Sequence, residues 1–189
     1  MSFNITDFRQ AMQFDGQRPN LFDVTITNVS NAFQGKDLRF FAKATSIPGA
    51  TIGQVVVPYF GREVKFAGNR TFAEWTITII NDETFNIRGQ MENWMNAINS
   101  HDTNIRTAGS GSSSYVTDAT VSQFAKDGSL TSTYVFKHIF PTDISEITLD
   151  WGDNDTIEEF TCTFAYDFWT RSASEQPGSY GEAFSAIAQ

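Results

Sequence analysis

The spacing of apolar residues changes once within residues 68–99, and this change predicts a strand followed by a helix. Over residues 71–80 apolar and polar side chains alternate, which is typical of a strand with one buried face. After Asn81 and Asp82, whose side chains suit a helix N-terminus, the apolar positions take helical spacing at Met91, Trp94, Met95 and Ile98. We therefore expect one long strand that leads into the only substantial helix.

The same alternation recurs along most of the chain and predicts a mainly β protein. It is clearest over residues 20–29 and 156–169. Lys126-Asp127-Gly128 separates two alternating segments and is typical of a β-hairpin turn. Further strands are predicted at residues 39–46, 52–60, 115–125, 130–140 and 144–151. The pattern favours an antiparallel β-barrel or sandwich of about seven to eight strands with one flanking α-helix.

The chain length of 189 residues is consistent with a single domain over residues 1–189. Within it we expect an N-terminal arm at 1–19, a barrel plus helix at 20–171 and a C-terminal tail at 172–189. Thr6 is predicted to cap a short helical turn in the arm. The Gly-Ser stretch at 108–114 is expected to be a flexible connector.

Inward-facing positions of these elements define a predicted core. Cys162 lies among them and is expected to be a buried small hydrophobe. His138 shares a face with aromatic residues, so we expect a core or cleft histidine with a hydrogen-bond partner. The predicted core comprises Phe22, Val24, Ile26, Trp75, Ile77, Trp94, Phe136, Phe160, Phe164 and Phe168.

The charge balance argues against tight nucleic-acid binding. The chain has 13 basic and 22 acidic residues, a net charge of −9, and its basic residues form no run. Tight binding to phosphates depends on clustered Lys and Arg, so this protein should repel any DNA that it meets. No apolar run approaches the ~20 residues of a membrane helix, and no leader is recognised, so we expect no membrane anchor.

No arrangement of residues predicts catalysis. Asp150, Asp153 and Asp155 miss the spacing of a calcium loop and are expected to form a polar turn. The Gly-x-Gly at 109–111 is followed by no Lys and opens no helix, so it is not a phosphate loop. With only two His and no nucleophile motif, we expect neither an enzyme nor a cofactor or metal site.

Two surfaces stay open to a functional or an ordinary interpretation. Residues 60–70 carry Arg62, Lys65 and Arg70 together with Gly61 and Gly68, and Lys43 lies upstream. This segment is either a solvated hairpin tip or a projecting loop that docks on an acidic copy of the same protein. Polar strand faces are either exposed sheet or the lining of a channel, and their candidates are Glu74, Thr76, Thr78, Glu159, Thr161 and Thr163.

An ordered set of motifs resembles the tail-tube proteins of contractile-tailed bacteriophages of the T-even type. The resemblance extends from about Phe22 to Trp169. Its first half comprises Ser46-Ile47-Pro48-Gly49, Tyr59-Phe60-Gly61-Arg62, residues 67–72 and 75–82, and Trp94. Its second half comprises Asp127-Gly128, Phe140-Pro141, Ile144-Ser145, Leu149-Asp150-Trp151, Asp155, Ile157-Glu158-Glu159-Phe160 and residues 164–169.

The resemblance implies a structural virion protein, assembled in the host cytoplasm, whose hexameric rings stack into a tube that DNA passes through. Implied partners are further copies of itself, the tail sheath, the tape-measure protein and DNA in the lumen, and the baseplate and tail-terminator proteins. By region, it implies ring-to-ring docking by Tyr59, Gly61, Arg62, Lys65, Gly68 and Arg70, and it makes the polar candidates above possible lumen residues.

Two other functions stay open. The fold is similar to the ring protein of type VI secretion, so the same ring could belong to a secretion or contractile-injection tube that carries protein effectors. A monomeric carbohydrate-binding β-sandwich would instead use Trp151 or Trp169 as a stacking platform.

Overall fold

The protein was analysed as a computed structural model that describes residues 4–12, 16–29, 33–34, 38–109 and 111–173. The predicted tail at 172–189 lies outside the described residues, apart from its first two positions. The elements are α1 (Ile5–Ala11), β1 (Phe22–Ile26), α2 (Leu38–Phe41), β2 (Ala42–Thr45), β3 (Ala50–Tyr59), β4 (Arg62–Phe72), β5 (Trp75–Ile80), α3 (Asn86–Ile98), a 3-10 turn (Ser112–Ser114), β6 (Thr117–Phe124), β7 (Leu130–Ile144), β8 (Glu159–Ala165) and β9 (Phe168–Ala173). The mainly β class is confirmed.

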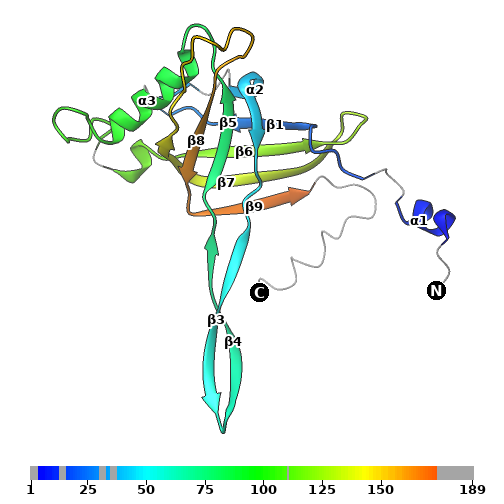
Figure 1. The fold of residues 1–189 in the computed structure, drawn as a ribbon. Coiled ribbons are helices and arrows are strands. Elements are labelled where there is room, and N and C mark those ends of the chain that lie inside the picture. Colours follow the sequence, from blue (N-terminus) through cyan, green and yellow to red (C-terminus); the bar gives the residue numbers. More distant parts are fainter. Residues whose placement is uncertain (1–3, 13–15, 30–32, 35–37, 110, 174–189) are drawn as a thin grey trace.

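Antiparallel strands form one seven-stranded sheet and one separate hairpin. The large sheet has the order β1-β6-β7-β8-β5-β2, with β9 added on β7, and the hairpin consists of β3 and β4. The 15-residue strand β7 belongs to both halves of the sheet, because it pairs with β6 and β9 early and with β8 from Phe140 onward. The two halves run in different directions, and α3 lies at one end of them (Figure 1).

The core lies between the two halves of the sheet and the inner side of α3. Trp75 stacks on Phe136 with 4.5 Å between ring centroids, and Trp94 stacks on Phe33 at 5.4 Å. Phe22 is partly buried against this core. Of the other predicted core residues, those that are buried are Val24, Ile26, Trp75, Ile77, Trp94, Phe136, Phe160 and Phe164.

Phe168 was expected in the core, but its side chain is 43% exposed. Residues 156–169 do not form one strand, because β8 ends at Ala165 and β9 begins at Phe168. Both strands lie along the same edge of β7, with Ala165 opposite Phe140 and Phe168 opposite Lys137. The alternation of β8 therefore does not continue into β9. Trp169 packs against the core instead.

The predicted strand over residues 71–80 is also divided, since β4 ends at Phe72 and β5 begins at Trp75. Ala73 and Glu74 separate a segment that pairs only with β3 from one that pairs with β2 and β8. The predicted strand at 39–46 likewise begins as the helical turn α2. Alternation alone does not locate these breaks, because each is set by which distant strand is the partner.

The predicted break between strands at residues 141–143 is absent. Strand β7 continues through Pro141 to Ile144, and the register with β8 shifts between Pro141 and Asp143. Such a bulge accommodates a residue that has no N–H to donate. The strand predicted over 144–151 is absent: residues 145–150 carry no strand assignment.

His138 is exposed, contrary to the prediction of a core or cleft position. Its φ of +58° falls at a register shift between β6 and β7, and Ile139 is buried in its place. The bulge exchanges the two faces of the strand at this point. The expected hydrogen-bond partner is present, because His138 Nδ1 lies 2.7 Å from Asp167 Oδ2.

The helices follow the local signals with small shifts. Ile87, Met91 and Trp94 form the buried stripe of α3. Asp82 Oδ1 accepts a hydrogen bond from the first backbone N–H of α3, at Asn86 (3.1 Å). Helix α1 is capped by Asn4, not by Thr6 as predicted, because the Asn4 side chain accepts from the Thr6 N–H at 3.0 Å. No residue of α1 is buried, as expected of an arm.

Candidate functional site

The β3–β4 hairpin projects from the body of the molecule (Figure 1). Its strands continue from β2 and into β5, which both belong to the large sheet, but in the described part of the chain they pair only with each other. Ten residues of β3 extend on the order of 33 Å. An isolated two-stranded hairpin is marginal in water, so contact with a further surface would stabilise this one.

One face of the outer half of the hairpin is mostly apolar, with Arg62 as its one charged residue. The register pairs Val55 with Phe66, Val57 with Val64 and Tyr59 with Arg62, which places these side chains on the same face. The exposed fraction of each of the five apolar residues lies between 41% and 65%. The opposite face is mixed, with Val56 and Pro58 facing Lys65 and Glu63.

The tip of the hairpin places an aromatic residue in an unfavourable conformation. Phe60 and Gly61 have φ of +44° and +78°, as the two central residues of a type I′ turn do. That conformation suits Gly and strains a bulky aromatic residue. Phe60 is nevertheless 91% exposed and makes an edge contact with Tyr59. An exposed and strained aromatic side chain is characteristic of a functional position.

The spacing of the glycines suggested that Gly68 ends the loop that begins at Gly61. In the structure Gly68 lies inside strand β4 instead. A Cβ at this position would lie 3.0 Å from the backbone oxygen of Gly53 on β3. The two glycines therefore let the strands approach closely near the register shift between Ile52 and Gln54.

The three basic residues of the hairpin are available for an external partner. Arg62, Lys65 and Arg70 are exposed and take part in none of the ion pairs found among the described residues. Lys43 differs from them, because it is paired with Glu159. The hairpin thus carries three unneutralised cations and one carboxylate, Glu63.

Four of the six polar candidates meet on one face of the large sheet. Strands β5 and β8 pair Thr76 with Thr163 and Thr78 with Thr161, so the four hydroxyls form two adjacent cross-strand pairs. All four side chains are half-buried. Glu159 lies opposite Ile80 at the end of the same ladder. Glu74 is exposed in the break between β4 and β5 and lies outside the ladder.

The sequence reasoning missed a second face rich in hydroxyl groups, on β1, β6 and β7. Thr25 Oγ1 lies 3.0 Å from Thr120 Oγ1, and Ser122 Oγ lies 3.4 Å from Thr133 Oγ1. Beside them, Lys137 is hydrogen-bonded to Asp118. Partial burial opposes ionisation of Asp118, but its bonds to Lys137 and to the His138 N–H dominate and lower its pKa.

The side chains that could do chemistry occupy structural positions. Burial, with the nearby Asp143 carboxylate, strongly raises the pKa of the Cys162 thiol, which disfavours the nucleophilic thiolate. Burial also raises the pKa of Tyr166, whose hydroxyl donates to the Ala73 carbonyl at 2.6 Å. Among the described residues, no three His, Cys, Asp or Glu side chains are grouped to hold a metal. Asp150 Oδ1 accepts from the Gly152 N–H, consistent with a polar turn.

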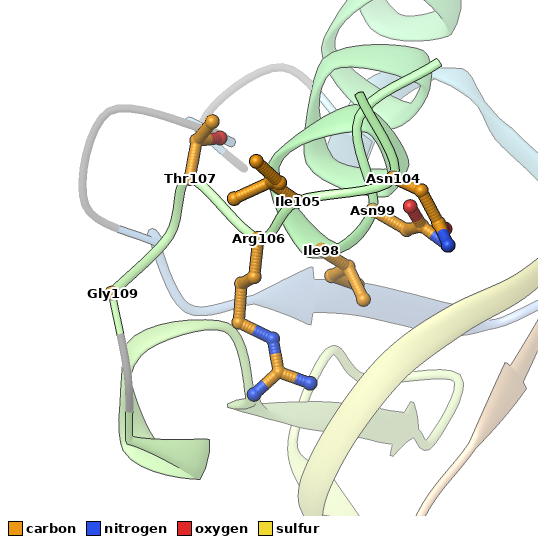
Figure 2. A pocket seen from close by; sticks show the side chains of 7 residues that line it. All are labelled: Ile98, Asn99, Asn104, Ile105, Arg106, Thr107 and Gly109. Carbon is orange, nitrogen blue, oxygen red and sulfur yellow. The ribbon is translucent and has the colours of Figure 1, made fainter. Parts of the chain in front are cut away.

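A shallow hollow of about 600 Å³ lies beyond the C-terminal end of α3 (Figure 2). The Arg106 guanidinium lies 4.5 Å from the centroid of the Tyr115 ring, which orients it by a cation–π contact. The lining has one cation and no acid or base to work with it, so the hollow does not form an active site. Its residues are Ile98, Asn99, Asn104, Ile105, Arg106, Thr107 and Gly109.

The described residues include no helix long and apolar enough to cross a membrane. Their features are instead those of a surface that binds protein: a projecting apolar hairpin with free basic residues, and polar sheet faces with short side chains. Sequence reasoning found the basic residues but not the tip residue Phe60. The sequence did contain a signal for this tip. Phe60-Gly61 stands between two alternating segments, in the place where a two-residue hairpin turn usually has Asn-Gly.

Comparison with known proteins points the same way. The family described as phage tail tube protein matches residues 7–172. Tail tube protein gp19 of Enterobacteria phage T4 is 33% identical over 156 residues, covering 82% of this chain and 91% of its own.

Two solved structures share the fold at low sequence identity. The anti-feeding prophage tube-terminating cap has a TM-score of 0.62 and 16% identity, covering 84% of this chain and 92% of its own. A chain of the sheath–tube complex of an extracellular contractile injection system, PVC, has a TM-score of 0.60 and 17% identity, covering 92% and 100%.

Proposed function

Because this chain belongs to the phage tail tube protein family, we propose that its copies form hexameric rings that stack into the inner tube of a contractile tail. Membership of the family makes it a structural virion protein and not an enzyme. DNA would leave the virion through the lumen of the stacked rings.

The β3–β4 hairpin is the observation that carries this proposal. A monomer would expose five apolar side chains on one hairpin face, together with a strained aromatic tip. Soluble monomers rarely expose contiguous apolar surface of this kind, whereas assembly surfaces do. The hairpin, with Tyr59, Gly61, Arg62, Lys65, Gly68 and Arg70, would dock a copy in the next ring.

The large sheet offers a second reason to assemble. Its path ends at β1 and β2, whose outer edges lie next to no other strand in the part of the chain that the structure describes. An edge strand presents unpaired backbone N–H and C=O groups. Neighbouring copies around a ring would cover these strand edges. Ring closure and axial stacking thus require two different surfaces of the same molecule.

The lumen in this proposal is lined by the β5–β8 face. Thr76, Thr78, Thr161 and Thr163 give it short hydroxyl side chains, with Glu159 at one end of the ladder and Glu74 in the break before β5. A lining without free cations, in a protein of net charge −9, would not retain phosphates, within a screening length of about 8 Å at physiological salt. DNA would slide along it, as would the tape-measure protein before it.

The remaining partners follow from the tube. One protein of similar fold is a chain of a sheath–tube complex and another terminates a tube. We extend this to the present chain: the exposed side of α3 would face the sheath or the neighbouring subunit, and the tube would begin at a baseplate and end at a terminator protein.

The family assignment bears on the two other functions considered from the sequence. A contractile-injection tube uses the same ring, but the relative at 33% identity is a phage tail protein, which favours a phage tail. A monomeric carbohydrate-binding protein does not fit the family. Trp151, its proposed platform, is exposed on a loop, while Trp169 packs against the core.

Light scattering and negative-stain microscopy of the purified protein test the proposal. With increasing concentration we expect a change from monomers to annular particles with an axial bore, and then to tubes. A protein that stays monomeric at every concentration, up to millimolar, would contradict both tube functions.

A further inference from the structure

The loop between β7 and β8, residues 145–158, lies at the end of the molecule opposite to the hairpin (Figure 1). The register settles this, because Trp75 at the start of β5 pairs with Phe164, while Ile80 at its end pairs with Glu159. The hairpin precedes Trp75, and the loop precedes Glu159. We name residues 145–158 the apical loop.

The apical loop exposes large apolar side chains without an evident partner in this molecule. Leu149 is 78% exposed, Ile157 is 71% exposed and Trp151 is fully exposed. Together with Glu159, the loop encloses a hollow of about 400 Å³. The apical loop thus combines a concave surface with apolar side chains, as protein-binding surfaces do.

The charge of the apical loop is opposite to that of the hairpin. It contains five carboxylates and no basic residue: Glu146, Asp150, Asp153, Asp155 and Glu158. Two of these are engaged locally, because Asp150 accepts from the Gly152 N–H and Glu158 accepts from the Asn81 side chain. The hairpin has three basic residues and one acidic residue.

We propose that the apical loop is the receptor for the hairpin tip of a copy in the next ring. In this contact Phe60 enters the hollow beside Trp151, and Arg62 and Lys65 face the carboxylates of the loop. Phe60 is the most exposed aromatic residue of the hairpin, and its strained turn holds it at the tip, where a receptor would meet it first.

The opposite placement of the two surfaces explains how a stack could grow. A tip at one end and a receptor at the other make a head-to-tail contact, which repeats with every added ring and does not close on itself. Opposite charges at the two ends also disfavour rings that meet tip to tip or loop to loop. The inference rests on the proposed tube and identifies the partner surface of its hairpin.

Charge reversal on each surface tests the contact. Arg62→Glu with Lys65→Glu, and separately Asp150→Lys with Asp153→Lys, should each shorten tubes at least tenfold in micrographs while single rings persist. All four substitutions in one chain should restore long tubes, because the charges are again complementary. Phe60→Ser should shorten tubes with no change of charge. Circular dichroism melting checks that each variant is folded.

Arg9→Glu with Arg18→Glu is the matched control, since it changes the net charge by the same amount at two exposed positions outside the hairpin. It should leave tube length unchanged. If either charge-reversed variant still forms long tubes, the apical loop is not the receptor. The same conclusion follows if the variant with all four substitutions is folded but stays as single rings. If the unmodified protein forms no rings, the proposed tube itself is contradicted. Failure of the proposed receptor is therefore distinguishable from failure of the proposed function.

Discussion

Trp75 connects three strands through a single side chain. It is fully buried, its ring stacks on Phe136 of β7 and contacts Phe164 of β8, and its Nε1 donates to Thr45 Oγ1 of β2 at 2.9 Å. Phe60 and Trp151 are the opposite case, because both are large aromatic residues left in solvent. At the scale of residues, aromatic side chains therefore serve either the core or, in our proposal, the contact between rings.

Trp75→Ala should lower the free energy of unfolding by about 3–5 kcal/mol, because it leaves a cavity between the two halves of the sheet. Urea unfolding followed by circular dichroism measures this. Trp151→Ala is the control for loss of a tryptophan, and it should change the free energy by less than about 0.5 kcal/mol, since Trp151 is fully exposed. Equal unfolding midpoints for the two variants would contradict the assigned core.

At the scale of elements, α3 depends on a residue that precedes it. Phe85, at the N-cap position, has a φ of +53° and provides no side-chain bond, so the carboxylate of Asp82 accepts from the Asn86 N–H instead. Asp82 also accepts from the Thr84 hydroxyl, and these bonds, that from Thr84 foremost, lower the pKa of its carboxyl group from its ordinary value. The ionised form of Asp82 is therefore the one that stabilises the folded state.

Asp82→Ala should reduce stability by about 0.5–2 kcal/mol at pH 7, as loss of a helix cap does. The contribution of Asp82 is complete above its unfolded pKa and is lost as the pH falls through its lower folded pKa. The difference between variant and unmodified protein should thus shrink below about pH 4. Urea unfolding at pH 7 and at pH 3 measures it.

Glu83→Ala is the matched control for this experiment, because Glu83 is exposed and is the next residue in the chain. It should be nearly neutral at both pH values. A loss of stability in Asp82→Ala that is equal at pH 7 and pH 3 would show that the carboxylate does not act through its ionised form.

At the scale of the whole molecule, two hydroxyl-rich sheet faces are candidates for the lining of the lumen. The β5–β8 face carries Thr78 opposite Thr161, and the β1–β6 face carries Thr25 opposite Thr120. Both faces carry short polar side chains, and our proposal assigns the β5–β8 face to the lumen.

Thr78→Lys with Thr161→Lys should slow DNA ejection from phage particles, because every ring would present twelve new cations to the passing phosphates if it has six copies. DNA release measured over time tests this. Thr25→Lys with Thr120→Lys is the matched variant on the other face and should leave ejection unchanged. Slow ejection in the second variant alone would place the lumen on the β1–β6 face.

The sequence alone determined the mainly β class, most strand positions, the stripe of α3 and the hairpin turn at Asp127-Gly128. These features are local, because alternation, helical spacing and turn residues act within a few positions. The basic residues of the β3–β4 hairpin were visible for the same reason. The ordered motifs added the family, which the comparison confirmed.

Only the tertiary structure decided where strands end and what meets across the sheet. The breaks at Ala73-Glu74 and Tyr166-Asp167, and the exchange of His138 for Ile139, depend on distant partner strands. The pairing of Thr76 with Thr163 and the opposite placement of hairpin and apical loop follow from the same register. Pairing between residues some ninety positions apart leaves no local signal, because either strand would show the same alternation with another partner.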